Sequence, residues 1–118
     1  MSTIQFTINY RTNQEQKVHD FLDNYVLKAG IEIQDLKIER YWKEKDQMQA
    51  TFLAKTDSIR SEEKTFEILK LANVLATTNR HHWTFNGPYE NGGLTFGCLF
   101  NNDNKDEPLT WANIELED

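Results

Sequence analysis

The chain has 118 residues, the length of one domain, because single hydrophobic cores usually occupy about 100–150 residues. It carries 13 basic and 19 acidic side chains, and this net charge of −6 argues against direct binding of nucleic acid, which needs clusters of Lys and Arg. One cysteine excludes a disulfide framework and a cysteine-rich zinc site. The first residues do not resemble a signal peptide, and no apolar run approaches the roughly 20 residues that span a bilayer. We therefore expect a single domain, residues 1–118, in the cytoplasm, with no membrane partner.

The first half of the chain predicts a strand, a helix and two further strands. Strict alternation of apolar and polar residues indicates the first strand over residues 3–10. A helix follows, opened by a capping box at Asn13 and Gln16 and stopped by Gly30. Its apolar stripe has helical spacing and consists of Val18, Phe21, Leu22, Tyr25 and Ala29. Residues 36–42 and 48–54 then form two strands joined by a polar turn around Lys45 and Asp46.

The second half predicts one helix and three strands. Ser61 is the expected N-cap of the helix, which runs to about residue 77. Its expected apolar stripe is Thr65, Ile68, Leu69, Ala72, Leu75 and Ala76. Residues 82–85, 94–100 and 109–116 are the three strands, separated by two polar loops.

The resulting order β-α-β-β-α-β-β-β predicts an α+β fold, an antiparallel sheet with two helices on one face. Its first six elements match the split βαβ, ferredoxin-like arrangement. We expect the additional C-terminal strands to extend or curl that sheet.

Few residues suggest chemistry. His81 and His82 are neighbours on a strand, so their side chains point to opposite faces and cannot chelate one ion together. Cys98 shares an apolar face with Leu94, Phe96 and Phe100, where a thiol behaves as a small hydrophobe. No nucleophile motif and no phosphate-binding loop is recognisable. We therefore expect no catalytic residues, no metal, no cofactor and no enzymatic activity.

The charge is divided unevenly along the chain. Residues 1–60 hold nine basic and nine acidic side chains, whereas residues 61–118 hold four basic and ten acidic ones. Residues 101–118 alone have one basic side chain against six acidic ones. The structural interpretation is that these acids only keep the chain soluble. The functional interpretation is an acidic surface that docks on a basic protein partner, because charge steers such encounters and buried aromatic residues hold the complex.

The candidate partner-binding residues combine acidic side chains with two aromatic anchors. They are Tyr89, Glu90, Asp103, Asp106, Glu107, Trp111 and Glu115. Trp111 also has a competing role in the core, since its strand presents Ala112, Ile114 and Leu116 as well. The sequence does not say which face of that strand is buried.

The C-terminal part of the chain resembles that of a known class of proteins. The stretch Trp83-Thr-Phe-Asn-Gly-Pro-Tyr-Glu-Asn-Gly-Gly-Leu-Thr-Phe96, then Asn101-Asn102 and Leu109-Thr-Trp-Ala-Asn-Ile-Glu-Leu116, is similar in style to bacterial immunity proteins of contact-dependent growth inhibition and related polymorphic toxin systems. The resemblance covers about the last 35 residues, together with the size and the charge. It implies a cytoplasmic, non-enzymatic inhibitor that binds a cognate basic toxin domain of nuclease type. No residue role can be transferred by position.

Two other hypotheses stay open. One is a small-molecule-binding or regulatory module of ferredoxin-like type, which predicts an apolar pocket with convergent polar groups. The other is a small enzyme that uses His81 or His82 with Glu90, which predicts a histidine of perturbed pKa beside a carboxylate. The oligomeric state is also open, because exposed edge strands can pair two copies.

Overall fold

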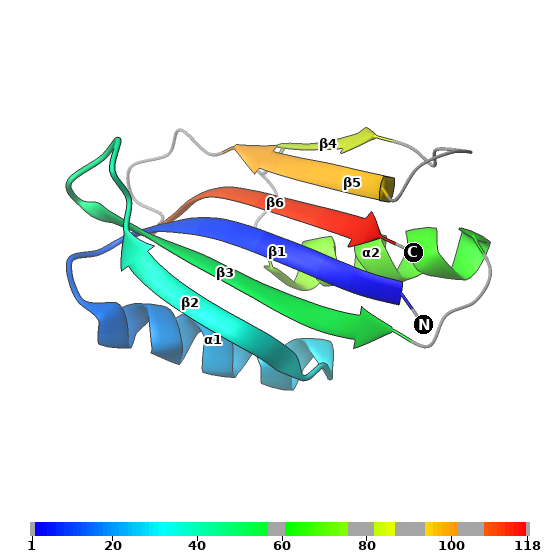
Figure 1. The fold of residues 1–118 in the computed structure, drawn as a ribbon, viewed down its shortest axis with the longest axis horizontal. Helices are drawn as coiled ribbons and strands as arrows, with labels where there is room; N and C mark the ends of the chain where they lie inside the picture. The colour runs from blue at the N-terminus through cyan, green and yellow to red at the C-terminus, as the bar shows by residue number, and fades with distance from the viewer. Residues whose placement is uncertain (1, 57–60, 76–81, 87–93, 102–107, 118) are drawn as a thin grey trace.

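The computed structural model describes residues 2–56, 61–75, 82–86, 94–101 and 108–117, and these residues form an α+β fold (Figure 1). The order of the elements is the one expected from the sequence. The strands are β1 (Ser2–Arg11), β2 (Ile33–Arg40), β3 (Gln47–Thr56), β4 (His82–Asn86), β5 (Leu94–Asn101) and β6 (Leu109–Glu117), and the helices are α1 (Glu15–Ala29) and α2 (Ser61–Leu75).

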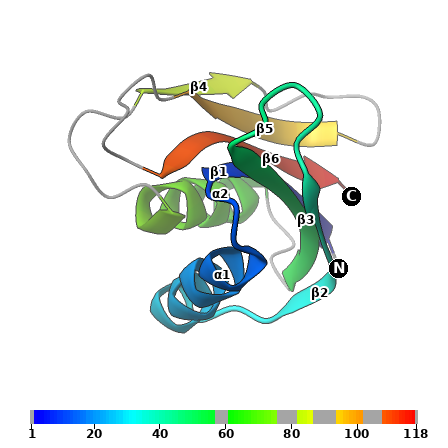
Figure 2. The same ribbon diagram turned by 90° about the vertical axis from the view of Figure 1, so that its left-hand side faces the viewer.

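The six strands form one sheet in the order β2-β3-β1-β6-β5-β4, and every neighbouring pair is antiparallel. β1 lies inside the sheet, paired with β3 on one side and with β6 on the other. The two helices cover the same face of the sheet, as Figure 2 shows from the end of the strands. The opposite face carries neither helix.

The ferredoxin-like expectation is only partly correct. β2, β3 and β1 have the neighbours of the split βαβ arrangement, in which the fourth strand lies beside the first. Here β6 occupies that place, and β5 separates β6 from β4, so the last two strands are inserted into the sheet and β4 becomes its edge. The physical reason lies in β6, whose Ala112, Ile114 and Leu116 are fully buried and belong in the middle of the core.

The core fills the space between the sheet and the helices. β1 contributes Ile4, Phe6 and Ile8, which are almost completely buried. The Phe6 ring stacks on Phe52 of β3 with centroids 4.7 Å apart and meets the Tyr25 ring of α1 edge-on at 6.1 Å. Burying an aromatic ring of this kind removes about 150–250 Å² from water, so this cluster is a main source of stability.

The first helix begins differently from the prediction. Its N-cap is Gln14, which makes no side-chain capping hydrogen bond, so the expected capping box is wrong. Thr12 Oγ1 instead accepts a hydrogen bond from the Gln14 backbone N–H at 3.1 Å, and the Gln16 side chain donates forward to Asp20. The predicted end is confirmed, because Gly30 adopts a left-handed conformation with φ 68° and donates its N–H to the Val26 carbonyl.

The end of β2 and the apolar stripe of α2 also differ from the prediction. β2 ends at Arg40, before the predicted end at residue 42, because Tyr41 begins a turn in which its backbone N–H donates to the Gln47 carbonyl oxygen at 3.0 Å. In α2 the buried stripe includes Leu71, whereas the predicted Leu69 is 41% exposed. The predicted extension of this helix to residue 77 lies outside the described residues.

Candidate functional site on the open face of the sheet

Alternation along the central strands separates a core face from a face without helices. On β1, Ile4, Phe6 and Ile8 point to the helices, so the intervening residues point away from them. The register places residues of β3 and β6 beside those of β1 on the same side of the sheet. We call this surface the open face; its half-buried residues are Thr3, Gln5, Thr7, Gln49, Thr51, Leu53, Trp111, Asn113 and Glu115.

Trp111 belongs to the open face and not to the core. The buried residues of its strand are Ala112, Ile114 and Leu116, which answers the question that the sequence left open. Trp111 lies opposite Asn9 of β1 and opposite Asn101 of β5 in the register. Its indole is therefore a half-buried aromatic group in the middle of the sheet.

Glu115 lies on the same side of the same strand. It is opposite Gln5 of β1, and one of its carboxylate oxygens accepts a hydrogen bond of 2.8 Å from the Asn113 side-chain amide. This hydrogen bond fixes the orientation of the carboxylate. The structure thus places Trp111 and Glu115, two of the seven candidate residues, on the same face of β6 with Asn113 between them.

The remaining candidates lie outside the described residues. They are Tyr89, Glu90, Asp103, Asp106 and Glu107. His81 also lies outside, and the structure describes His82 only as the first residue of β4, in register with Asn101. Cys98 lies on β5 in register with Ile114 of β6.

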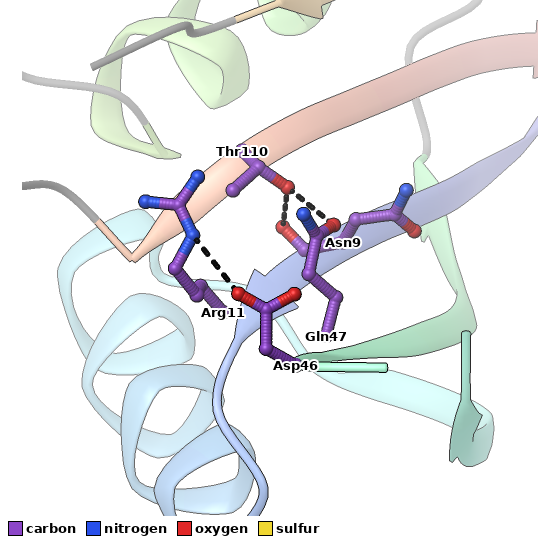
Figure 3. Close-up of polar contacts among 5 residues, drawn as sticks. All are labelled: Asn9, Arg11, Asp46, Gln47 and Thr110. Atoms are coloured by element: carbon purple, nitrogen blue, oxygen red, sulfur yellow. Dashed lines mark hydrogen bonds and ion pairs between the residues drawn. The ribbon is translucent and has the colours of Figure 1, made fainter. Parts of the chain in front are cut away.

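A polar cluster holds the start of β6 in place (Figure 3). Thr110 is the extra residue of a β-bulge, since Asn9 pairs with Trp111 while Tyr10 pairs with Leu109. The Thr110 hydroxyl lies 3.2 Å from the Asn9 carbonyl oxygen and 2.9 Å from the Gln47 side-chain oxygen. A hydroxyl has one hydrogen, so Thr110 cannot donate to both oxygens at once. Both contacts form together when the side-chain oxygen and nitrogen of Gln47 are exchanged, so that the Gln47 nitrogen donates to the Thr110 hydroxyl while that hydroxyl donates to the Asn9 carbonyl oxygen.

Two more contacts connect this cluster to its surroundings. The Arg11 side chain is 3.8 Å from the Asp46 carboxylate, which joins β1 to the β2–β3 turn. The Arg11 backbone N–H donates to the Pro108 carbonyl at 2.7 Å. Pro108 immediately precedes β6, so this hydrogen bond holds the start of that strand beside Arg11. The cluster therefore fixes the position of the residue that precedes Trp111 on β6.

The β2–β3 turn carries an aromatic residue that the sequence analysis did not select. Trp42 is 82% exposed, its ring lies 6.4 Å from that of Tyr41, and Lys43 Nζ is 4.9 Å from the centre of the indole. The sequence predicts a strand over residues 36–42 that includes Trp42, whereas β2 ends at Arg40. The useful signal was the charged run from residue 43 to residue 46, which begins the turn earlier.

No family model, curated protein or solved structure matched the chain in the three comparisons with known proteins. Within the described ranges, no group of three His, Cys, Asp or Glu side chains is placed to hold a metal ion. No helix among the described residues is long and apolar enough to cross a membrane.

Proposed function

We propose that this protein is a non-enzymatic inhibitor, an immunity protein that binds and neutralises a cognate basic toxin domain, and that the open face is its contact surface. The observation that carries the proposal is that Trp111 and Glu115 share this face. An aromatic ring and a carboxylate on one face are the groups that the sequence predicts for contact with a basic partner.

The composition of the open face suits a protein partner. Trp is one of the residue types most often found at the energetic centre of an interface, where a ring of polar contacts excludes water around it. Around Trp111 the open face offers hydroxyl and amide groups from Asn113, Thr7 and Gln49, which both donate and accept hydrogen bonds. Glu115 supplies a carboxylate that a Lys or Arg of the partner can bind.

The rigidity of the site favours tight binding. Trp111 and Glu115 lie on a strand with neighbours on both sides, and the next residues along it are buried. The Asn113 amide holds the Glu115 carboxylate, and the polar cluster holds the start of the strand. Groups that are already ordered lose little conformational entropy when a partner binds.

The negative charge of the chain favours a partner with a positively charged surface. The net charge is −6, and residues 101–118 contribute most of it, including Glu115. A basic partner is attracted at long range and binds faster at low ionic strength. Asp103, Asp106 and Glu107 remain proposed contributors, because they belong to the same acidic stretch of the sequence.

Affinity capture with matched baits tests the proposal. The wild-type protein is immobilised beside Trp111→Ala, Glu115→Lys and Asp23→Lys, and proteins bound from a lysate of the source cell are quantified by mass spectrometry. Asp23 is exposed on α1, on the helical side of the molecule, so its charge reversal is the control for net charge. We expect one basic protein that the wild type and Asp23→Lys retain and the two open-face variants lose.

Neutralisation distinguishes an inhibitor from other binding proteins. The captured protein is expressed in a host cell with and without the wild-type chain. The proposal requires that the captured protein arrests growth and that the wild-type chain prevents this. Capture of a harmless protein, or arrest that the chain does not relieve, would exclude an immunity function.

A further inference from the structure

β2 is an edge strand of the sheet. In the described part of the chain β2 has one neighbouring strand, β3. The outer side of an edge strand presents backbone N–H and C=O groups that can pair with another strand. What this edge can pair with depends on its regular portion and on its side chains.

The regular portion of β2 is short. The register with β3 shifts between Gln34 and Lys37, and Asp35 in this bulge has a left-handed φ of 56°. Bulges bend an edge away from continuous pairing. Residues 37–40 follow the bulge and pair regularly with residues 48–51 of β3. A second strand can therefore extend the sheet along residues 37–40.

The charges of this portion are self-complementary. Lys37 and Glu39 lie on the same side of the strand, are largely exposed, and form an ion pair of 2.6 Å. Two copies of one strand that pair antiparallel are related by a two-fold axis, and residues directly opposite each other have their side chains on the same side of the sheet. Because only alternate residues of a strand share a side, the axis must lie beside a residue and not between two residues. An axis at Lys37 sets Lys37 against itself, and an axis at Glu39 sets Glu39 against itself.

An axis at Ile38 avoids both repulsions. Lys37 of each copy then lies opposite Glu39 of the other, which gives two attractive cross-strand pairs. Ile38, which is half-buried at the margin of the core, meets Ile38 of the second copy. Trp42, whose indole is 82% exposed, lies in the turn that follows this portion of the edge.

We propose that the β2 edge binds a second copy of this chain, antiparallel, with the two-fold axis at Ile38. The two sheets become continuous, and the open face with Trp111 and Glu115 is left free for another partner. This assembly does not depend on the proposed inhibitor function, since it uses a different surface. The paired edge is short, and small interfaces give weak complexes, so we expect the dimer to dissociate on dilution.

Charge reversal tests the register. Sedimentation equilibrium is measured for the wild type, Lys37→Glu, Glu39→Lys and the double reversal, with circular dichroism to verify folding. Each single reversal replaces two attractive pairs by two repulsive ones and weakens dimerisation about tenfold or more, and the double reversal restores it. The matched control is Lys70→Glu on α2, which breaks a similar intrachain pair with Glu67 and leaves dimerisation unchanged.

A cysteine placed on the axis gives an independent measurement. In a Cys98→Ala background, Ile38→Cys sets two thiols on directly opposite residues, whose Cα atoms lie about 4.5–5.5 Å apart, within the range of a disulfide. Oxidation then yields a covalent dimer from Ile38→Cys and none from Leu36→Cys, which lies off the axis. A monomeric wild type, a dimer that ignores the Lys37 reversal, or equal cross-linking at both positions would overturn the inference.

Discussion

The hydroxyl of Tyr25 in α1 donates a hydrogen bond of 3.0 Å to the carbonyl oxygen of Leu71 in α2. The two residues are 46 positions apart in the sequence, and the contact is buried. Because the Tyr25 ring also packs edge-on against Phe6 of β1, one side chain connects both helices to the sheet. The Tyr25 side chain therefore helps to fix the position of the helical layer.

Removing the Tyr25 hydroxyl tests this connection. Tyr25→Phe keeps the ring and loses a buried hydrogen bond, so we expect the free energy of unfolding to fall by about 1 kcal/mol. Urea denaturation measures the change. Tyr41→Phe is the control, because Tyr41 lies in the β2–β3 turn, and it should change the free energy by less than about 0.5 kcal/mol. Equal stability of Tyr25→Phe and the wild type would contradict the role of the hydroxyl.

The polar cluster at the β-bulge should respond to loss of one hydroxyl. Thr110→Val is nearly isosteric but leaves the buried Asn9 carbonyl without the Thr110 donor, so we expect a loss of about 1–3 kcal/mol. Thermal and urea unfolding measure it. Thr51→Val, on the half-buried open face, makes the same chemical change and should cost less. If both variants lost the same stability, the cluster would not be the reason.

A substitution at Gly30 measures the cost of a left-handed backbone conformation alone, because an added side chain meets no neighbouring atom there. Its φ is 68°, and a Cβ built on it meets nothing within 4 Å. Gly30→Ala should therefore cost only the left-handed conformation of an L-residue, about 1–2 kcal/mol, and Gly30→Asn should cost less. A loss well above that range in urea unfolding would mean that the helix end is more tightly packed than the structure describes.

Tyr10 should make stability depend on alkaline pH. Burial, with a smaller contribution from the Asp20 charge, raises the pKa of Tyr10 above its ordinary value of 10.0. The unfolded chain then loses this proton at a lower pH than the folded chain, so the free energy of unfolding decreases as the pH rises through and above about 10. Tyr10→Phe should flatten this part of the pH profile. Parallel profiles for the variant and the wild type would contradict the shift.

Local pattern in the sequence was sufficient for the order and type of the elements. The alternation of Ile4, Phe6 and Ile8 and the helical stripe from Val18 to Ala29 both depend on periodicity, which survives in a single sequence. The sheet order depends instead on contacts between distant strands. The alternation of Ala112, Ile114 and Leu116 predicts a half-buried strand over residues 109–116, but it does not identify β1 as the neighbour of that strand.

Only those residues of the site could be predicted whose side-chain chemistry alone is typical of an interface. Trp111 and Glu115 could be selected because an aromatic anchor and a carboxylate are typical of interfaces with basic partners. Their neighbours Gln5 and Gln49 could not be selected, because they come from strands whose register with β6 is set by the whole sheet. Trp42 was missed because a strand was extended two residues into a turn.

The affinity of the captured partner for Trp111→Ala tests the central claim most directly. The dissociation constant of the purified basic partner is measured by calorimetry for the wild type and for this variant, with melting curves to verify that both are folded. Truncation of a central aromatic anchor typically costs 2 kcal/mol or more, so we predict an affinity at least about 30-fold weaker. An unchanged dissociation constant in a folded Trp111→Ala protein would show that the open face is not the binding surface.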